Sequence, residues 1–359
     1  MSILSLETVA SNRHLVRGLT VACTLLAAGF LTSGTPEKAE AAEQLNCAPA
    51  PSKCGYPDAT NTGLVTKIKV TKRVRIKKQK HVIKRKKLRG KKRFRYVKRH
   101  SYKNVSFKTI PDDVRSGPGW RWDSIGRVAI DKDGTVFKNY IVKGTLDVLA
   151  DNVTIDNVRV YNSGDFGIAL RRADNTTINN CMVGPAPGAP RIFTAIKDVY
   201  ADSTNTKIYR CNLYGWATGI QIYRGVIAHN YIHDPIYKNG DHTNGITSNG
   251  FTDPLSIVHN TIFNHLNQTD AIGLFQDFGR EANRTIANNL MAGGGYSLYA
   301  GQDSGAPAAY NIKVYDNRFS RIFYSRGGYY GPATAYNSKA SGNLWQNNIW
   351  DDTGAAVYP

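Results

Sequence analysis

The apolar positions of this chain follow a short phrase that repeats from residue 151 to the C-terminus. In each copy an apolar residue is followed three positions later by a small or amide residue, and five positions later by a second apolar residue, as in Ile257, Asn260 and Ile262. Eight copies recur at intervals of roughly 20 to 30 residues, and a second phrase, a small residue before Ile or Leu, recurs between them, as in Gly245-Ile246. Internal periods of this length indicate a solenoid, a propeller or another repeat array.

The pattern within each copy predicts strands. The apolar positions lie in short runs interrupted by Asn, Gly and Asp, without the runs of ten or more residues at helical periodicity that helical repeats need. A propeller blade of four antiparallel strands needs about 40 residues, whereas about 25 to 30 residues suit one turn of a coil built from two or three short strands. We therefore predict an all-β chain that winds into a coil of stacked strands.

The fourth position of the phrase supports the coil. In five successive copies this position is asparagine: Asn230, Asn260, Asn289, Asn317 and Asn348. Identical amides on successive turns can hydrogen-bond along a parallel, in-register column, and buried polar groups persist where such bonds satisfy them. The sequence thus predicts an asparagine ladder along one bend of the coil, and direct contact between residues about 30 positions apart.

Residues 105–359 resemble the right-handed parallel β-helix proteins of the pectate-lyase-like superfamily, in which asparagine ladders at a bend are typical. The segments Cys54–Gly63 and Trp350–Gly354 resemble the two ends of secreted actinobacterial proteins of this type. The resemblance implies a right-handed parallel β-helix solenoid. It implies no single activity, because the superfamily includes lyases, hydrolases, epimerases and binding proteins, and a fold alone does not define a function.

The N-terminal residues predict an export signal. Arg13 and Arg17 precede an apolar run from Leu19 to Leu31, and small residues follow where a signal peptidase cleaves. The run is shorter than the roughly 20 apolar residues of a membrane-spanning helix. We expect a secreted, extracellular protein that makes no integral membrane contact. Its predicted parts are a signal peptide (1–41), an N-terminal cap segment (42–63), a basic insert (64–104) and the β-helix (105–359).

The cysteines fit an oxidising compartment. Apart from Cys23, which lies inside the export signal, four cysteines remain, and four permit three pairings. Cys47 and Cys54 are close enough in sequence to close a short loop. The repeat places Cys181 and Cys211 on adjacent turns, where strands about 4.8 Å apart suit the Cα separation of a disulfide. The alternative for that second pair is two stacked buried thiols.

Charge is concentrated in residues 64–104, which contain 20 of the 47 Lys and Arg residues and no Asp or Glu. The other 27 basic residues equal the 27 acidic ones, so the formal charge of +20 belongs to this insert. Apolar and basic positions alternate at its start, which predicts a hairpin with a turn near Gly90; a solvated arm is the alternative. We expect the insert to bind anionic cell-wall polymers, and no specific nucleic acid, because it contains no base-reading motif.

The repeat also brings polar side chains together on neighbouring turns, where a β-helix of this superfamily forms its substrate groove. Asn244 ends an Asp-His-Thr-Asn phrase at a position where similar proteins often carry Asp, and Asn is the weaker base. Gln268 and the two residues after it resemble a phrase of polygalacturonases whose other motifs are missing. The catalytic candidates are Asp241, His242, Asp270 and Asp277, and the substrate-binding candidates are Arg172, Lys197, Arg224, Asn244, Gln276 and Asp303.

Two reactions on an acidic polysaccharide would use these residues. A glycoside hydrolase needs two carboxylates about 5 to 5.5 Å apart for retention or 6.5 to 9.5 Å apart for inversion, and Asp241 with Asp270 or Asp277 with Asp303 would meet this spacing across the turns. A lyase needs a base and a cation beside the uronate, often Ca²⁺ held by carboxylates. We favour the hydrolase slightly, because the Arg-Pro signature of pectate lyases is missing, with either no cofactor or Ca²⁺.

A non-catalytic interpretation competes with both reactions. Asp and Asn commonly end strands and hold turns, so a coil without activity would display the same residues. In that case the protein is a monomeric adhesion or wall-binding module, whose coil is a rigid spacer and whose insert binds the polymer. His229 and His259 share a column, and we interpret them as a solvated polar row because no third metal ligand accompanies them.

Overall fold

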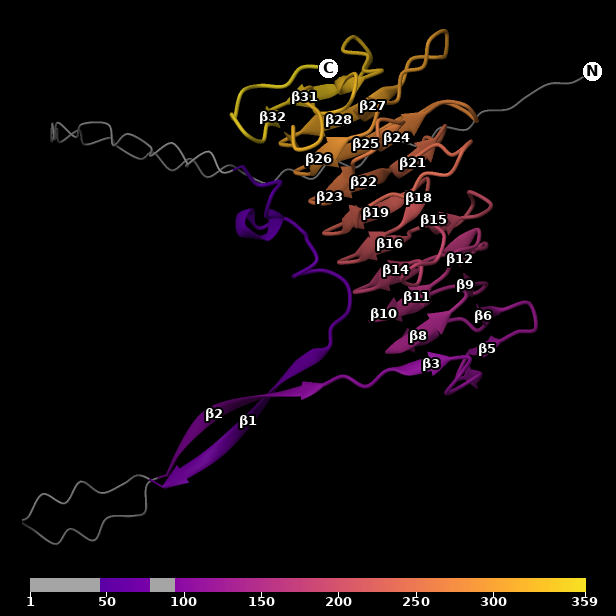
Figure 1. Cartoon of the computed structure of the whole chain (residues 1–359), viewed down its shortest axis with the longest axis vertical. Coiled ribbons are helices and arrows are strands. Elements are labelled where there is room, and N and C mark those ends of the chain that lie inside the picture. The colour runs from indigo at the N-terminus through magenta and orange to yellow at the C-terminus, as the bar shows by residue number, and fades with distance from the viewer. Residues whose placement is uncertain (1–45, 78–93) are drawn as a thin grey trace, which may run out of the picture. The chain divides into compact units, whose positions relative to one another are not determined.

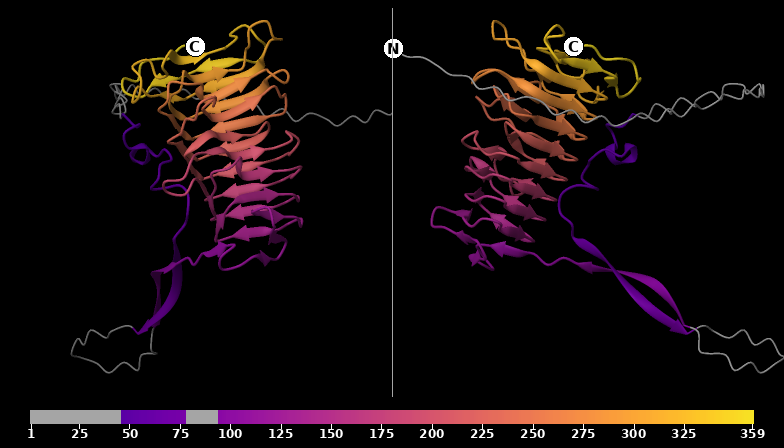
Figure 2. Two further views of the ribbon diagram at one scale, coloured as in Figure 1. Left: turned by 45° about the vertical axis from the view of Figure 1, so that its right-hand side comes forward. Right: turned by 180° about the vertical axis from the view of Figure 1, so that it is seen from behind.

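The structure is a computed structural model that describes residues 46–77 and 94–359, which belong to one compact unit. The predicted signal peptide (1–41) and the predicted turn at Gly90 lie outside the described residues. From Lys108 to Trp350 the chain winds into a coil whose walls are three sheets (Figure 1). Each strand pairs with the strand one turn later in the chain, so that the sheets run the length of the coil (Figure 2). The prediction of an all-β coil of parallel strands is confirmed.

The nine-stranded sheet is parallel throughout and includes the strands that precede the asparagine positions. Its strands, in spatial order, are β7 (Val136–Lys138), β10 (Thr154–Asp156), β13 (Thr177–Asn179), β16 (Lys207–Tyr209), β19 (Gly225–Ala228), β22 (Leu255–Val258), β25 (Ala282–Ala287), β28 (Tyr310–Tyr315) and β31 (Leu344–Gln346).

The ten-stranded sheet follows the bend that holds the asparagines, and it is also parallel. Its strands are β3 (Lys108–Ile110), β8 (Tyr140–Lys143), β11 (Arg159–Tyr161), β14 (Met182–Gly184), β17 (Asn212–Tyr214), β20 (Tyr231–His233), β23 (Thr261–Asn264), β26 (Leu290–Gly293), β29 (Arg318–Phe319) and β32 (Ile349–Trp350).

The eleven-stranded sheet completes each turn, and only its first two junctions, β4 to β5 and β5 to β6, are antiparallel. Its strands are β4 (Ser116–Gly117), β5 (Trp120–Trp122), β6 (Arg127–Ile130), β9 (Thr145–Val148), β12 (Phe166–Leu170), β15 (Ile192–Asp198), β18 (Trp216–Gln221), β21 (Asn244–Asn249), β24 (Asp270–Phe275), β27 (Tyr296–Ala300) and β30 (Gly331–Thr334).

The core lies between the three sheets and consists of stacked aliphatic columns. In the nine-stranded sheet, Ile178 pairs in register with Ile208, and Ile257 with Ile286, and all four side chains are buried. The residues that flank Ile178, Ile208 and Ile257 along their strands are half-buried, so the Ile side chains face the interior and the flanking residues face outward. Each fully buried Ile contributes about 1.5 to 3 kcal/mol relative to an exposed one. The first apolar residue of the repeated phrase therefore builds the core.

The bend after each strand of the nine-stranded sheet is made by one residue in the left-handed conformation. This residue directly precedes the fourth position of the phrase, as at His259 (φ 54°), Asn288 (φ 52°) and Asp316 (φ 56°). Asn and Asp tolerate this conformation better than most other residues with a side chain. The local sequence thus turns the chain at the same place in successive turns.

The asparagines after this bend form a continuous hydrogen-bonded column. The Nδ2 group of each donates to the Oδ1 atom of the next, at 2.9 Å for Asn230 to Asn260 and 3.0 Å for Asn260 to Asn289, and the bonds continue through Asn317 to Asn348. Each Oδ1 atom also accepts the backbone N–H of the asparagine below it. The column satisfies amides that are otherwise completely enclosed.

Below these asparagines the column position is occupied by Cys181 and Cys211, and the predicted disulfide between them is wrong. Both cysteines are buried free thiols. Each sulfur lies near the backbone carbonyl two residues earlier, at 3.3 Å from Asn179 and 3.2 Å from Tyr209, so each thiol is turned into its own bend. The alternative of stacked buried thiols is the correct one. The predicted disulfide between Cys47 and Cys54 is confirmed.

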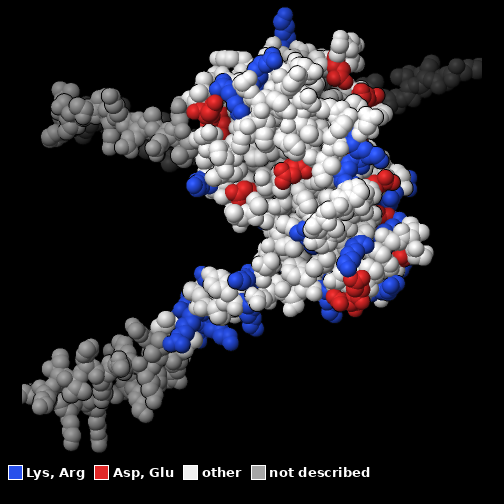
Figure 3. Space-filling model, viewed as in Figure 1, with Lys and Arg blue, Asp and Glu red and all other residues white. Residues whose placement is uncertain are grey.

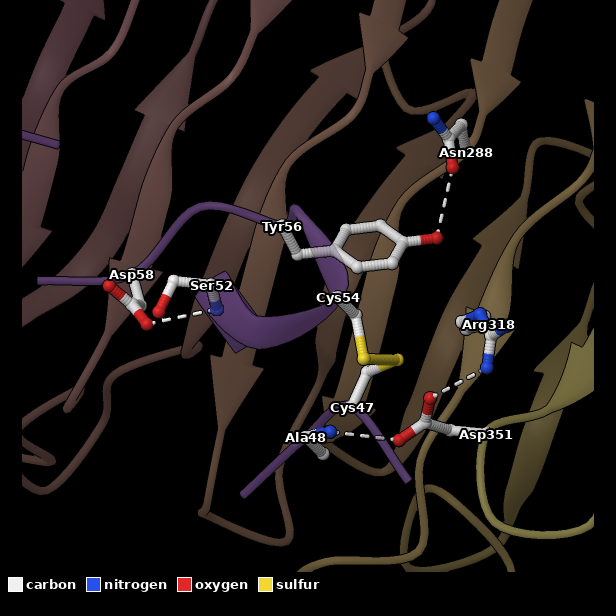
Figure 4. Close-up of a disulfide and its surroundings, with 9 residues drawn as sticks. All are labelled: Cys47, Ala48, Ser52, Cys54, Tyr56, Asp58, Asn288, Arg318 and Asp351. Carbon is white, nitrogen blue, oxygen red and sulfur yellow. Dashed lines mark hydrogen bonds and ion pairs between the residues drawn. A yellow bond between two sulfur atoms is a disulfide. The ribbon is translucent and has the colours of Figure 1, made fainter. Parts of the chain in front are cut away.

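The segment 46–66, here called the strap, crosses the coil against the direction in which the turns advance. Near its start, the N–H of Ala48 donates to the Asp351 carboxylate (2.9 Å), and the Tyr56 hydroxyl donates to Asn288 (2.9 Å), as Figure 4 shows. Near its end, Val65 exchanges two hydrogen bonds with the Asn157 side chain, at 2.7 and 3.0 Å. A short 3-10 helix, η1 (Pro51–Cys54), lies inside the loop that the disulfide closes.

Residues 67–104 contain the hairpin strands β1 (Lys67–Lys77) and β2 (Phe94–Asn104), which pair antiparallel along their whole length. The described part of the basic insert is thus a hairpin, which was one of the two alternatives. The residues between the strands lie outside the described part of the chain.

One ion pair lies inside the core. Arg284 occupies a position in β25 whose register partners, Leu255 and Ile312, are buried core residues. Its Nε donates to Oε1 of Glu281 (2.6 Å), and neither side chain is exposed. The second Glu281 oxygen accepts two backbone N–H groups, of Gly250 and Phe251. This satisfied pair fixes the loop between β21 and β22.

Candidate functional site

The outer face of the eleven-stranded sheet displays one side chain per turn in a straight row. Side chains alternate along a strand, so the residue that follows each buried Ile or Leu of the second phrase lies on the side away from the core, where Lys197, Gln221 and Tyr299 are half-buried and Thr247 is covered. The strand registers align these residues on successive turns. The outer row is Asp147, Ala169, Lys197, Gln221, Thr247, Gly273, Tyr299 and Thr334.

Asp270 lies beside this row but is completely covered. Its carboxyl group lies over Gly273, where any side chain would bring its Cβ to 2.4 Å from Oδ2. Phe275 lies against the same point, and its ring is 5.4 Å from that of Tyr299. Neither oxygen of Asp270 accepts a hydrogen bond from a side chain of the described residues. Burial raises the pKa of Asp270 well above its usual range, against a smaller lowering by the Gly245 backbone N–H, and favours the neutral form.

Asn244 and His242 lie on the neighbouring turn. Asn244 is the register partner of Asp270, so these two predicted residues are brought together. The Asn244 amide is buried, and its Nδ2 donates to the backbone carbonyl of His242 at 3.4 Å. The His242 side chain is exposed to solvent.

Asp241 belongs to a buried ion pair. It is buried, and both of its oxygens accept hydrogen bonds from the Arg191 guanidinium. One oxygen also accepts the backbone N–H of Lys238 at 2.9 Å. A carboxylate engaged in this way holds the loop before β21 in place. The structure thus places Asp241 in an ion pair with Arg191, and a catalytic role for Asp241 with His242 stays a prediction.

Asp277 and Asp303 are engaged in the same kind of contact between turns. The Asp277 carboxylate accepts the Asn249 amide (2.8 Å), while its own N–H donates back to that side chain (2.7 Å). Asp303 exchanges the equivalent pair of bonds with Gln276, at 2.7 and 3.1 Å. These reciprocal bonds secure the ends of β21, β24 and β27, and they occupy both predicted acids and the predicted ligand Gln276.

The three predicted cations are separated. Lys197 belongs to the outer row, where its ammonium contacts Gln221 and burial lowers its pKa. Arg224 donates to the Ala201 carbonyl (3.0 Å) and lies 3.5 Å from the Asp253 carboxylate. Arg172 is largely exposed on the turn after β12 and pairs with Asp202 at 3.2 Å. Of the three, only Lys197 faces the outer row.

Asp270 has no second carboxylate on the strands around it. The two strands on either side, β18 and β21 below and β27 and β30 above, contain no Asp or Glu. The predicted partner, Asp241, is neutralised by Arg191. The arrangement supplies one neutral acid, which can donate a proton or a hydrogen bond, without the second carboxylate that glycoside hydrolysis uses.

Aromatic rings form a continuous cluster above Asp270. Successive ring centroids are separated by 5.4 Å (Phe275 to Tyr299), 5.5 Å (Tyr299 to Tyr296) and 5.8 Å (Tyr296 to Tyr330). Tyr329 contacts Tyr330 at 4.9 Å and extends the cluster. The Tyr330 side chain is 56% exposed, so the outer end of the cluster is open to solvent.

A cavity of about 290 Å³ lies between the two loops that lead into β21 and β24. Tyr237, Leu266, Asn267 and Gln268 line it, and Tyr237 is 49% exposed. Thr243 joins the loops by donating to the Gln268 carbonyl (2.9 Å). Sequence reasoning missed this corner cavity, although the long loop after His233 indicated that the chain leaves the regular coil here.

His229 and His259 form a contact pair in which His229 is exposed and His259 is half-buried. Their Nδ1 atoms are 2.8 Å apart, and the Tyr56 ring of the strap stacks on His259 with a centroid separation of 5.3 Å. Burial lowers the pKa of both imidazoles, and the Arg210 charge lowers that of His229 further. Within residues 46–77 and 94–359, no group of three or more His, Cys, Asp or Glu side chains is arranged to hold a metal ion.

No model of a known protein family matches the chain, and no curated protein sequence matches it. Two solved structures are similar to parts of it. The Dettilon tailspike protein (gp208) is 15% identical, with a TM-score of 0.40, over 62% of this chain and 48% of the tailspike. PfbA, a surface adhesin of Streptococcus pneumoniae, is 14% identical, with a TM-score of 0.32, over 60% of this chain and 62% of the adhesin. The chain thus spans about half and about three fifths of these two proteins.

The described residues contain no helix that is both long and apolar enough to cross a membrane.

Proposed function

We propose that this protein is an extracellular, polysaccharide-binding β-helix protein of the pectate-lyase-like type, which holds a glycan without cleaving it. The observation that carries the proposal is the environment of the predicted acidic site residues. Asp241, Asp277 and Asp303 are engaged in hydrogen bonds, and Asp270 is covered and lacks a second carboxylate beside it. A hydrolase needs two such groups flanking the bond to be cleaved.

The same surface is suited to binding sugars. Aromatic faces pack against the apolar faces of sugar rings, and Tyr330 and Tyr237 offer exposed rings at the outer end of the aromatic cluster and at the corner cavity. Lys197 and Gln221 follow one another along the outer row and provide hydrogen-bonding groups for hydroxyls or carboxylates. An extended chain lying along the coil axis would meet these groups in succession.

Binding by the coil is tested with purified protein against a panel of neutral and acidic polysaccharides. We expect Tyr330→Ala and Tyr237→Ala each to weaken binding to the preferred glycan about tenfold, a loss of about 1.4 kcal/mol. Tyr358→Ala is the matched control, because Tyr358 is 76% exposed near the C-terminus and belongs to neither region. Equal affinity of all three variants and the unmodified protein would contradict the proposed surface.

The absence of cleavage is tested on the same panel by product analysis. We expect the unmodified protein to release neither reducing ends nor unsaturated products, with or without Ca²⁺. Steady product release that Asp270→Asn abolishes would show that the protein is an enzyme whose neutral acid donates a proton. The hydrolase interpretation would then replace the binding interpretation.

A further inference from the structure

The two faces of the β1–β2 hairpin differ in chemistry. Lys67 of β1 lies opposite Asn104 of β2, and the register continues residue by residue to Lys77 opposite Phe94. Because side chains alternate along each strand, the odd-numbered residues of β1 share a face with the even-numbered residues of β2. The described side chains of this face, here called the cationic face, include Lys67, Lys69, Thr71, Arg73, Tyr96, Lys98, His100 and Tyr102. The opposite face has Ile68, Val70, Lys72, Val74, Val97, Arg99, Ser101 and Lys103.

Like charges lie directly opposite one another in this hairpin. Arg73 is the partner of Lys98, and on the opposite face Lys72 is the partner of Arg99. Such pairs destabilise a two-stranded sheet, and an isolated hairpin is only marginally stable in water. The insert contains no Asp or Glu that would neutralise them, and Figure 3 shows basic side chains gathered over these strands. An anionic partner would remove the repulsion.

The cationic face also contains exposed aromatic rings beside its charges. Tyr102 is 69% exposed and lies opposite Lys69, and Tyr96 is 56% exposed. The Arg73 guanidinium lies 4.6 Å from the centroid of the Tyr96 ring. Tyr96 and Tyr102 are six positions apart on one strand, which corresponds to about 20 Å at 3.3 to 3.4 Å per residue. A ligand that contacts both rings must therefore be an extended chain.

We propose that the cationic face binds an acidic polysaccharide, a chain of sugar rings that carry carboxylates. The rings of such a polymer pack on Tyr96 and Tyr102, while its carboxylates meet Arg73, Lys98 and the lysines near the start of β1. A polyanion without rings leaves the tyrosines unused, and duplex DNA keeps its bases stacked inside. This inference deepens the proposed function and rests on it for the extracellular setting in which such polymers occur.

The experiment compares three double variants of the full chain. Tyr96→Ala with Tyr102→Ala removes the rings, and Arg73→Gln with Lys98→Gln removes two charges from the cationic face. Lys72→Gln with Arg99→Gln is the matched control, because it removes an equally opposed pair of charges from the other face. Binding is measured to polygalacturonate, to the same polymer with its carboxylates reduced to alcohols, to polyphosphate and to single-stranded DNA.

We expect the tyrosine variant to bind polygalacturonate about tenfold more weakly and to bind polyphosphate as the unmodified protein does. The Arg73 and Lys98 variant loses more affinity for polygalacturonate than the control pair, and added salt weakens binding of the unmodified protein. Equal losses in the two charge variants, or a tyrosine variant that binds polygalacturonate normally, would overturn the assignment. Single-stranded DNA bound more tightly than polygalacturonate, with the same dependence on the tyrosines, would identify a nucleic-acid surface instead.

The outcome separates this inference from the proposed function. Hairpin variants leave the coil unaltered, so the thermal unfolding of the coil should be unchanged. If Tyr330→Ala binds the glycan as tightly as the unmodified protein does, and the hairpin variants still weaken binding to polygalacturonate, the proposed function alone is contradicted. If Tyr330→Ala weakens glycan binding as expected, and the hairpin variants bind polygalacturonate normally, this inference alone is contradicted.

Discussion

The coil and the hairpin of this protein use β-strands in opposite ways. In the coil, strands of two to seven residues are stable because neighbours cover them on both sides and an aliphatic core fills the interior. In the hairpin, two strands of 11 residues pair with each other alone, and their described side chains are mostly exposed and partly of like charge. Buried polar groups such as the column asparagines are therefore satisfied inside the coil, whereas the hairpin carries charge that remains for a partner to neutralise.

This difference indicates where substitutions should act on stability and where they should act on binding. A buried polar group in the coil has its partner on the next turn, so removing it leaves that partner unsatisfied. A basic residue of the hairpin faces solvent and another cation. Replacing it with a neutral residue should therefore lower the stability of the hairpin little, or raise it by relieving repulsion. The predictions below test this contrast.

The buried ion pair should give the largest effect. Arg284→Met leaves the Glu281 carboxylate enclosed without its cation, and breaking a buried pair in this way costs about 3 to 5 kcal/mol. We expect urea unfolding of the coil to shift accordingly. Arg280→Met is the control, because Arg280 is exposed four residues earlier in the chain. A cost for Arg284→Met no larger than that of Arg280→Met would contradict the assigned role.

The bend column should give the next largest effect, and it should depend on position. Asn260→Ala leaves the enclosed N–H of Asn230 without its acceptor, which costs about 1 to 3 kcal/mol for each unsatisfied group. Cys211→Ala, at the equivalent position lower in the coil, removes a thiol with weak hydrogen bonds and should cost about 1 kcal/mol. Equal costs measured by thermal unfolding would show that the amide bonds add nothing to the column.

The histidine pair beneath the strap should make docking of the strap sensitive to pH. Both imidazoles have a lowered pKa in the folded state, so below about 6.5, the ordinary value, the undocked state binds protons more strongly and docking weakens as pH falls. The effect should stay below about 1 kcal/mol, because both rings are partly open to solvent. Hydrogen exchange at Gly63, whose N–H donates to the Arg210 carbonyl, measures docking.

Two variants test this dependence on pH. His259→Gln should flatten it, whereas His242→Gln, which removes an exposed histidine in another loop, should leave it unchanged. The same pH profile in both variants would exclude the pair as its origin.

The smallest effect is expected in the hairpin. Arg73→Glu replaces a like-charge pair with an opposite-charge pair across from Lys98, which should stabilise the hairpin by about 0.5 kcal/mol at low salt. The coil should unfold at an unchanged temperature. Amide exchange in β1 and β2 measures the hairpin, and a gain that persists in 1 M salt would show a cause other than charge.

The sequence predicted those features that repeat. Ile178 and Ile208 had to be neighbours once the period was recognised, because a regular coil gives residues of one column the same environment. Asn244 and Asp270, which are both predicted site residues, lie opposite each other in register, whereas the predicted partner of Asp270 was Asp241.

Features that occur once could not be predicted in this way. Arg191 lies 50 residues before Asp241, in a loop that has no equivalent on other turns. The repeat pattern therefore could not predict the ion pair between Arg191 and Asp241. The corner cavity depends on the same irregular loops. The period correctly placed Cys181 and Cys211 on adjacent turns. It could not predict the direction of each thiol, because that direction depends on the local conformation of each bend.

The path of the strap has a consequence for the order in which this protein can fold. Ala48 finds its acceptor in Asp351, 303 residues later, so the strap cannot dock completely until the last turn exists. Contacts of such large sequence separation form slowly. The start of the strap thus remains unattached until the last turn has wound, and its docking is expected to be a late step in folding.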